Sequence, residues 1–270
     1  MLFLFLQVLS IYFIVSYSKY HQAAFGNTTN NVTGKINDRY SRVQQYFYLR
    51  KTNDSLIKAN EVLYNKLKEN FSLPDTGYKF IADTIKLDSL QKIRKYKYLS
   101  AKVISNSISA QSNYIVLSRG KLGQLRTGMG VVDPNGSAVG IITEVNDNYA
   151  VVMSLLHKDS HISGKLQKGG EAGTLNWDGK EPNIINLTNI SKSAKVSKGD
   201  AIITSGYSTS FPKGLSLGIV EEVSRETSSN LFRIKFRTTA NFYNLQYVYV
   251  IDNADQQGVE DILSRIKKEP

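Results

Sequence analysis

The sequence predicts a mainly β protein whose strands follow an apolar N-terminal segment and a long helix. From Ala101 onward, about a dozen short stretches rich in β-branched and aromatic residues alternate with turns of Gly, Pro and Asn. Residues 36–71 carry mostly apolar side chains at a spacing of seven, interrupted by Arg50, and residues 2–17 carry no charge. The 270 residues provide room for a real core, so we expect an all-β sandwich or barrels.

The N-terminal segment, LFLFLQVLSIYFIVSY over residues 2–17, predicts a membrane anchor. A spanning helix needs about 20 apolar residues, with about 17 as the lower limit, so this run is slightly short. No basic residue precedes it, and we therefore expect translation to begin upstream. A cleaved signal peptide is the alternative, although a basic leader and a clear cleavage site are both missing. We expect an anchor over residues 1–18 and a polar spacer over 19–35.

The next segment, residues 36–72, has the heptad spacing of a coiled-coil helix. The candidate dimer seam consists of Ile36, Val43, Ile57, Tyr64 and Leu67. A single amphipathic helix resting on the β region fits the same periodicity and stays open as an alternative. Leu73-Pro74-Asp75 ends the helix, and residues 73–100 form a linker.

The chain has no cysteine and a net charge of +11, much of it between Arg39 and Lys102. The absence of cysteine excludes disulfides and cysteine-based metal or redox sites. The clustered positive charge suits either an anionic partner or a solvated helix face. The stretch QKIRKYKY, residues 91–98, mixes cations with aromatic rings, as do nucleic-acid surfaces and ordinary edge strands. Behind a membrane anchor we expect the edge strand, and we expect no nucleic-acid partner.

One stretch, GDAIITSGYSTSFPKGLSLGIVEEV at residues 199–223, organises the β region. Its Gly and Pro residues mark places where the chain reverses, and the expected structural turn positions are Gly199, Asp200, Gly206, Pro212, Gly214 and Gly218. Gly206 and Gly214 are expected to supply backbone angles that a side chain would forbid. The physical expectation is a turn that closes a small barrel.

The order GD-x-x-x-TSG-x(4)-FP-x-G-x(3)-G-x-V in this stretch closely resembles the signature of the rod shape-determining MreC family. A second block, IVLSRGKLGQLRTGMGVVDPNGSAVGIITEV at residues 115–145, is similar to another run of that family. The resemblance implies two small six-stranded β-barrel domains that are similar to chymotrypsin-like barrels without a triad. We place them at residues 101–181 and 182–252, with a polar tail carrying one weak helix at 253–270.

The same resemblance implies a function without catalysis or cofactor. It implies a single-pass scaffold in the bacterial cytoplasmic membrane, with most of the chain outside the cytoplasm. Such a scaffold would self-associate as a dimer or filament and would bind and activate the penicillin-binding transpeptidase of cell elongation. It would act together with MreD, the RodA glycosyltransferase and the MreB filament. Candidate contact residues are apolar groups on turns, namely Phe211, Tyr207, Trp177 and Tyr243, and the alternative for each is core packing.

A serine hydrolase is the rival prediction, because chymotrypsin-like barrels carry a Ser-His-Asp triad in proteases. The available groups are Ser205, His157 or His161, and Asp200 or Asp159. Ser205 lies in TSG and not in a GDSG-type nucleophile turn, which argues against it. His157 and His161 in HKDSH have the spacing of metal ligands on a helix, but the segment reads as a polar loop without a third ligand. We expect no catalytic and no metal site.

Overall fold

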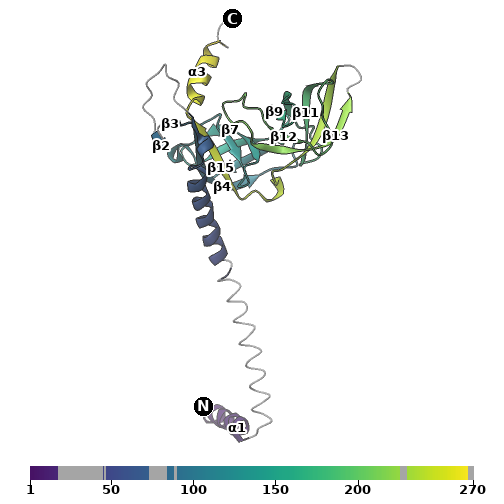
Figure 1. Ribbon diagram of the computed structural model, residues 1–270. Helices are drawn as coiled ribbons and strands as arrows, with labels where there is room; N and C mark the ends of the chain where they lie inside the picture. The colour runs from purple at the N-terminus through teal and green to yellow at the C-terminus, as the bar shows by residue number, and fades with distance from the viewer. Residues whose placement is uncertain (18–44, 46, 73–83, 88–89, 226–229, 267–270) are drawn as a thin grey trace. The chain divides into compact units, whose positions relative to one another are not determined.

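The computed structural model describes residues 1–17, 45, 47–72, 84–87, 90–225 and 230–266 (Figure 1). It divides into two compact units, Met1–Leu56 and Ile57–Pro270. The predicted spacer at 19–35 and the seam residues Ile36 and Val43 lie outside the described residues.

The first unit contains α1 (Leu2–Tyr17) and the first turns of a second helix, residues 47–56. α1 has no charged side chain in its first or last turn, and its hydrophobic residues are largely exposed. Among the described residues, no helix is both long and apolar enough to cross a membrane.

The second unit contains two closed barrels of six antiparallel strands each. The first barrel has the order β15-β4-β5-β8-β7-β6, with bounds β15 (Tyr247–Asn253), β4 (Tyr96–Asn106), β5 (Tyr114–Leu117), β8 (Ala150–Ser154), β7 (Ala138–Val145) and β6 (Gly130–Val132). The second barrel has the order β10-β11-β14-β13-β12-β9, with bounds β10 (Ala172–Asn176), β11 (Ile184–Ser191), β14 (Leu231–Thr238), β13 (Ser216–Arg225), β12 (Ala201–Thr204) and β9 (Ser163–Leu166). The prediction of two six-stranded barrels is confirmed.

The predicted boundary between the barrels, residues 181/182, does not match the strand pairing. β9 and β10 precede that boundary but close the second barrel, while β15 lies far beyond it and closes the first barrel between β4 and β6. The second barrel is therefore a contiguous insertion between β8 and β15 of the first (Figure 1).

Strict alternation of side chains builds both cores. Buried and half-buried residues alternate along β8, β9 and β10, so every second side chain points into a barrel. Irregular register in both barrels, for example between Val220 and Glu222, marks bulges that bend the strands as closure requires. A closed barrel of this size is filled by its own side chains, so function must lie on its outside and its loops.

The second helix continues to residue 64, and its last turns pack on the first barrel. Tyr64 stacks on Tyr98 with ring centroids 5.2 Å apart and lies 5.0 Å from the ring of Tyr249. The Tyr249 hydroxyl donates to the backbone oxygen of Ile57 at 3.1 Å, and Ile57 is 8% exposed. These contacts correct the predicted seam, because Ile57 and Tyr64 face their own barrel as the amphipathic-helix alternative expects.

Asn65 fixes the end of this helix to β4. Its side-chain amide donates to the Tyr98 carbonyl at 2.9 Å, and its oxygen accepts the Tyr98 N–H at 2.7 Å. The amide thus satisfies both backbone groups of Tyr98 as a neighbouring strand would. Leu67, the remaining described seam residue, is 45% exposed.

The predicted linker contains strands of its own. A short helical turn, η1 (Lys68–Asn70), leads into a three-stranded sheet of order β1-β3-β2, with bounds β1 (Phe71–Ser72), β3 (Leu90–Arg94) and β2 (Thr84–Leu87). β3 is the central strand of this sheet, so the expected edge strand at 91–98 divides between it and β4. The tail forms α3 (Gln256–Ile266), in agreement with the predicted weak helix.

Candidate interaction surfaces

The Gly199–Val223 stretch forms β12, a loop and β13, and two glycines of the loop have the predicted geometry. Gly206 has φ +85° and Gly214 has φ +98°, which are left-handed angles that favour glycine. Gly218, also predicted as a turn position, lies instead within β13, where it pairs with Ile202 and Thr238. The Thr204 hydroxyl donates to the Pro212 carbonyl at 2.6 Å and accepts the Leu215 N–H at 2.9 Å. These bonds hold the loop between the strands in one shape.

Phe211 is buried at the junction of the two barrels and does not form an exposed contact. It is 1% exposed, and a Cβ on Gly130 of β6 would lie 2.8 Å from its ring. The same Cβ would lie 2.2 Å from the Ser210 carbonyl oxygen, so only glycine fits at this crossing. The predicted interaction role of Phe211 is therefore wrong, because its ring fills the interface between the barrels. The sequence indicated a rigid turn but not what covers it.

Trp177 is a second correction. It is 3% exposed, and its indole N–H donates to the Glu181 carbonyl at 2.9 Å within the same chain. Both the polar and the apolar parts of the side chain therefore have partners within the chain.

Tyr207 and Tyr243 are exposed, as a contact role requires, at 83% and 62%. Tyr207 directly follows the TSG turn, and its backbone N–H donates to the Ser205 hydroxyl at 3.1 Å. Tyr243 lies in η3 (Phe242–Asn244), where the Asn241 side chain accepts its N–H at 3.1 Å. Both rings are presented to solvent from backbone held by local hydrogen bonds.

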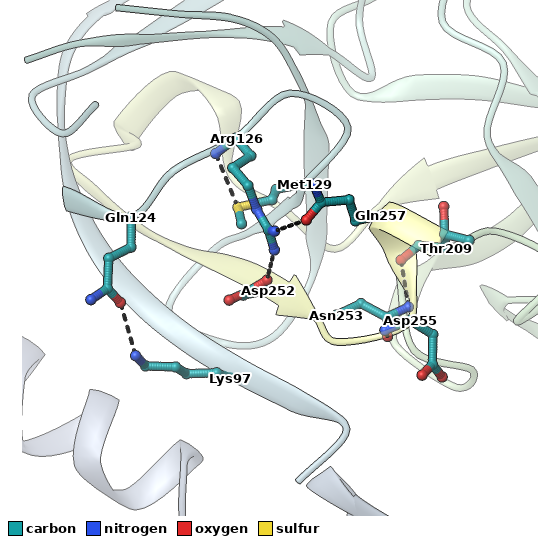
Figure 2. A network of polar contacts seen from close by, with 9 residues as sticks. All are labelled: Lys97, Gln124, Arg126, Met129, Thr209, Asp252, Asn253, Asp255 and Gln257. Atoms are coloured by element: carbon teal, nitrogen blue, oxygen red, sulfur yellow. Dashed lines mark hydrogen bonds and ion pairs between the residues drawn. The ribbon is translucent and has the colours of Figure 1, made fainter. Parts of the chain in front are cut away.

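The loop that carries Phe211 also meets the first barrel through a polar network, which Figure 2 shows. Asn253 at the end of β15 donates to the Thr209 carbonyl at 2.8 Å, and its own oxygen caps the Asp255 N–H at 3.1 Å. In the same view the Arg126 guanidinium forms an ion pair with Asp252 and donates to Gln257 at 3.0 Å. The network ties the loop before β6 to β15 and to the start of α3.

A hollow of about 860 Å³ opens beside this network. It is lined by Lys121, Gln124, Leu125, Arg126, Thr127, Val145, Asp252, Gln256 and Gln257. Its one arginine is already neutralised by Asp252, and Gln124 accepts a hydrogen bond from Lys97 at 2.9 Å. Most of its polar groups are therefore occupied within the protein.

The groups proposed for a protease triad make other bonds. Ser205 donates to the Ser163 hydroxyl at 2.8 Å. His157 is buried, with Nε2 3.0 Å from the Tyr114 hydroxyl and Nδ1 accepting the Asp159 N–H at 3.0 Å. Within the described part of the chain, Ser205 and His157 share no hydrogen bond, and no three His, Cys, Asp or Glu side chains gather as a metal site would require. Among the described residues, Ser205 and His157 are therefore not placed as a nucleophile and its base.

Two closed antiparallel barrels, locked together through Phe211 and Asn253, define a paired-barrel β protein with exposed aromatic loops. A family model described as "Rod shape-determining protein MreC, barrel core" matches residues 103–252, more than half of the chain. The chain belongs to this MreC family, as the two sequence blocks predict.

Individual relatives agree with this assignment. The "Cell shape-determining protein MreC" of Listeria monocytogenes is 24% identical over 217 residues, which cover 79% of this chain and 70% of the relative. A solved structure of MreC from Listeria monocytogenes has a TM-score of 0.55 at 23% identity and covers 80% of this chain and 94% of that one. A structure titled as the major periplasmic domain of the cell shape-determining filament MreC has a TM-score of 0.52 at 22% identity, over 60% and 99% of the two chains. At these identities the structures show the shared fold.

Proposed function

We propose that this chain is a membrane-anchored scaffold outside the cytoplasm that helps to determine cell shape. Membership of the MreC family supports the cell-shape role, since relatives carry that description in their names. The extracytoplasmic position is supported by a structural relative described as a periplasmic domain. The apolar α1 segment, which carries no charge, supports anchoring.

The proposed activity is docking and not catalysis. By its family resemblance, the chain binds and activates the elongation transpeptidase and acts with MreD, RodA and MreB. The observation that carries this proposal is the rigid presentation of Tyr207 on a loop whose other aromatic residue, Phe211, is locked into the barrel junction. Tyrosine is enriched at protein interfaces because its large ring loses little conformational freedom on binding. A fixed loop therefore offers an exposed ring at low entropic cost.

Self-association is the second part of the proposal. With Ile57 and Tyr64 engaged by the first barrel, the helix presents other apolar residues, and Leu49 and Leu56 are each 57% exposed and seven residues apart. Leucines at this spacing on a helix pack well against a second copy. We therefore place the self-association contact at Leu49 and Leu56 instead of the predicted seam.

A capture experiment tests the docking role. Full-length tagged chain is isolated from gently solubilised bacterial membranes, and bound proteins are identified by mass spectrometry. The parent chain is expected to capture the elongation transpeptidase, and Tyr207→Asp is expected to reduce this capture at least about tenfold, as loss of an interface hot spot does. Tyr149→Asp is the matched control, because Tyr149 is 48% exposed on a turn of the first barrel.

The outcomes separate the alternatives. Both variants should unfold at the temperature of the parent chain, since exposed substitutions change stability little. Equal capture by the parent chain and Tyr207→Asp would remove Tyr207 from the interface. Absence of any wall-synthesis enzyme from the folded parent sample would overturn the scaffold proposal itself.

A further inference from the structure

A basic hollow lies on the second barrel, and none of its lining residues belongs to the network of Figure 2. Its volume is about 570 Å³, and it is lined by Lys168, Gly169, Lys195, Ser197, Lys198, Gly199 and Asp200. Three lysines thus face a concave surface that contains a single acidic group.

That acidic group is fully engaged. One carboxylate oxygen of Asp200 accepts the Ser197 N–H at 2.8 Å, and the other lies 3.1 Å from the Lys168 ammonium. The Ser197 hydrogen bond first, and Lys168 second, lower the pKa of Asp200. Lys195 and Lys198 have no carboxylate partner among the described residues, so the hollow holds an excess of two positive charges.

Two further lysines add to this charge, Lys165 on β9 and Lys213 in the loop between β12 and β13. Lys165 pairs with Ile203 of β12, three residues before Lys168, and its ammonium group lies near enough to that of Lys213 for the two charges to interact. Partial desolvation first, and repulsion from Lys213 second, lower the pKa of Lys165. Neighbouring ammonium groups repel each other unless an anion lies between or beside them. In the part of the chain that the structure describes, neither has an acidic partner.

We propose that these five residues, Lys165, Lys168, Lys195, Lys198 and Lys213, form a lysine track that binds a flexible, linear glycopolymer carrying repeated phosphate or carboxylate groups. Lysine acts as a mobile point charge that suits such groups without fixing their geometry. Several lysines on one surface can pair with several anionic groups of one polymer, whereas a single small ion would pair with only one or two of them. This binding goes beyond the scaffold role and does not depend on it.

The residue types favour this ligand over other polyanions. Protein interfaces are depleted in lysine and enriched in arginine, whereas the track contains no arginine. Single-stranded nucleic acid is bound through several stacked aromatic rings, and no aromatic residue lines the hollow. A bilayer surface is flat, whereas Lys168, Lys195 and Lys198 line a concavity.

The test measures binding of the full-length chain, in a neutral detergent, to two fluorescent polymers by anisotropy. One polymer is a poly(glycerol phosphate), and the other is a polyuronate, so the two arms distinguish phosphate from carboxylate. The variant replaces Lys195, Lys198 and Lys213 with Gln, which keeps much of each side-chain stem. The control replaces the exposed lysines Lys102, Lys158 and Lys180 with Gln and removes the same net charge.

We expect the parent chain to bind at least one polymer in a salt-dependent manner. A lysine beside a densely charged anionic surface contributes on the order of a fivefold change in binding, so the track variant should lose about a hundredfold. The control should lose much less, because its lysines lie elsewhere on the surface. This pattern, with a smaller dependence on salt in the track variant, supports the proposal.

Three results would overturn it. Equal losses in the track variant and the control would show that net charge alone acts. Failure of both polymers to bind at physiological salt would exclude anionic glycopolymers as the ligand of the track. Tighter binding of a single-stranded oligonucleotide or of anionic lipid vesicles than of both polymers would assign the track to another macromolecule. Capture of the transpeptidase by a chain with Lys195→Gln and Lys198→Gln alone, which leaves the Tyr207 loop unchanged, reports separately on the scaffold role.

Discussion

The two barrels have the same number of strands and the same antiparallel closure, but the chain builds and covers them differently. The second barrel is contiguous, from β9 to β14, whereas the first needs β15 from the other side of that insertion. The first barrel is covered by Ile57, Tyr64 and Asn65 from the helix and by Phe211 from its neighbour. The second barrel presents Tyr207 and the lysine track to solvent.

This difference shows that two barrels with the same fold can have different roles in one chain. The first barrel serves as an assembly point where helix, second barrel and C-terminal strand meet, so substitutions there should act mainly on stability. The second barrel makes fewer packing contacts with the rest of the chain and therefore leaves more of its surface exposed to solvent. Function should therefore be lost most selectively by changes in its loops.

The largest expected effect comes from removing β15. A chain ending at residue 246 lacks the seven residues of β15 that pair with β4, three of which also pair with β6. We expect the first barrel to lose closure and the second to remain folded, since its six strands lie within residues 163–238. Hydrogen exchange should show loss of protection at Leu99 and Val131 but not at Ile202 and Phe236. Protection retained at all four positions would contradict the asymmetry.

The next effect concerns the contact between the barrels. Phe211→Ala removes a ring that is 1% exposed and leaves a cavity against Gly130, which should cost about 3–5 kcal/mol of unfolding free energy. Tyr207→Ala, four residues earlier in the same loop, should change the unfolding free energy by less than about 0.5 kcal/mol. Urea unfolding of the full-length chain in detergent measures both. Similar losses from the two substitutions would show that the loop acts as one unit.

Local features of this loop followed from the sequence. The glycines of TSG and FPKG predicted positive φ, and Gly206 and Gly214 have it. The alternation of short strands predicted barrels, because burial of every second side chain leaves its period in the sequence. These properties depend on neighbours within a few residues.

Long-range properties did not follow from the sequence. The burial of Phe211 depends on Gly130, some eighty positions earlier, and a turn motif does not show what will cover it. Heptad spacing correctly placed Ile57 and Tyr64 on one face of the helix. The pattern could not show whether a barrel or a second helix covers that face, because both partners require an apolar face. The sequence assigned β9, β10 and β15 to the wrong barrels for a related reason. Strands that pair across an insertion carry no sequence signal that identifies their partners.

The smallest effect is a pH dependence confined to the first barrel. Desolvation first, and then the neighbouring rings of Tyr64 and Tyr96, raise the pKa of Tyr98 to about 12 from its ordinary value of 10.0. Below pH 10 the hydroxyl is neutral in both folded and unfolded chains, so its contribution to stability is fully present. Between about pH 10 and 12 the Tyr98 hydroxyl ionises in the unfolded chain but stays neutral in the folded chain. About 3 kcal/mol of unfolding free energy is lost over this range.

Comparison of the parent chain with Tyr98→Phe isolates this group from the other tyrosines and lysines. We expect the two chains to diverge above pH 10, with Tyr98→Phe losing less stability, when unfolding is followed in urea at pH 9, 10 and 11. The loss should appear as faster hydrogen exchange at β4, which contains Tyr98, and at its partner strand β15 before it appears at β11 and β14 of the second barrel. If both barrels lose protection together, the Phe211 and Asn253 contacts couple them into one folding unit. The difference between the first and second barrels would then concern function and not stability.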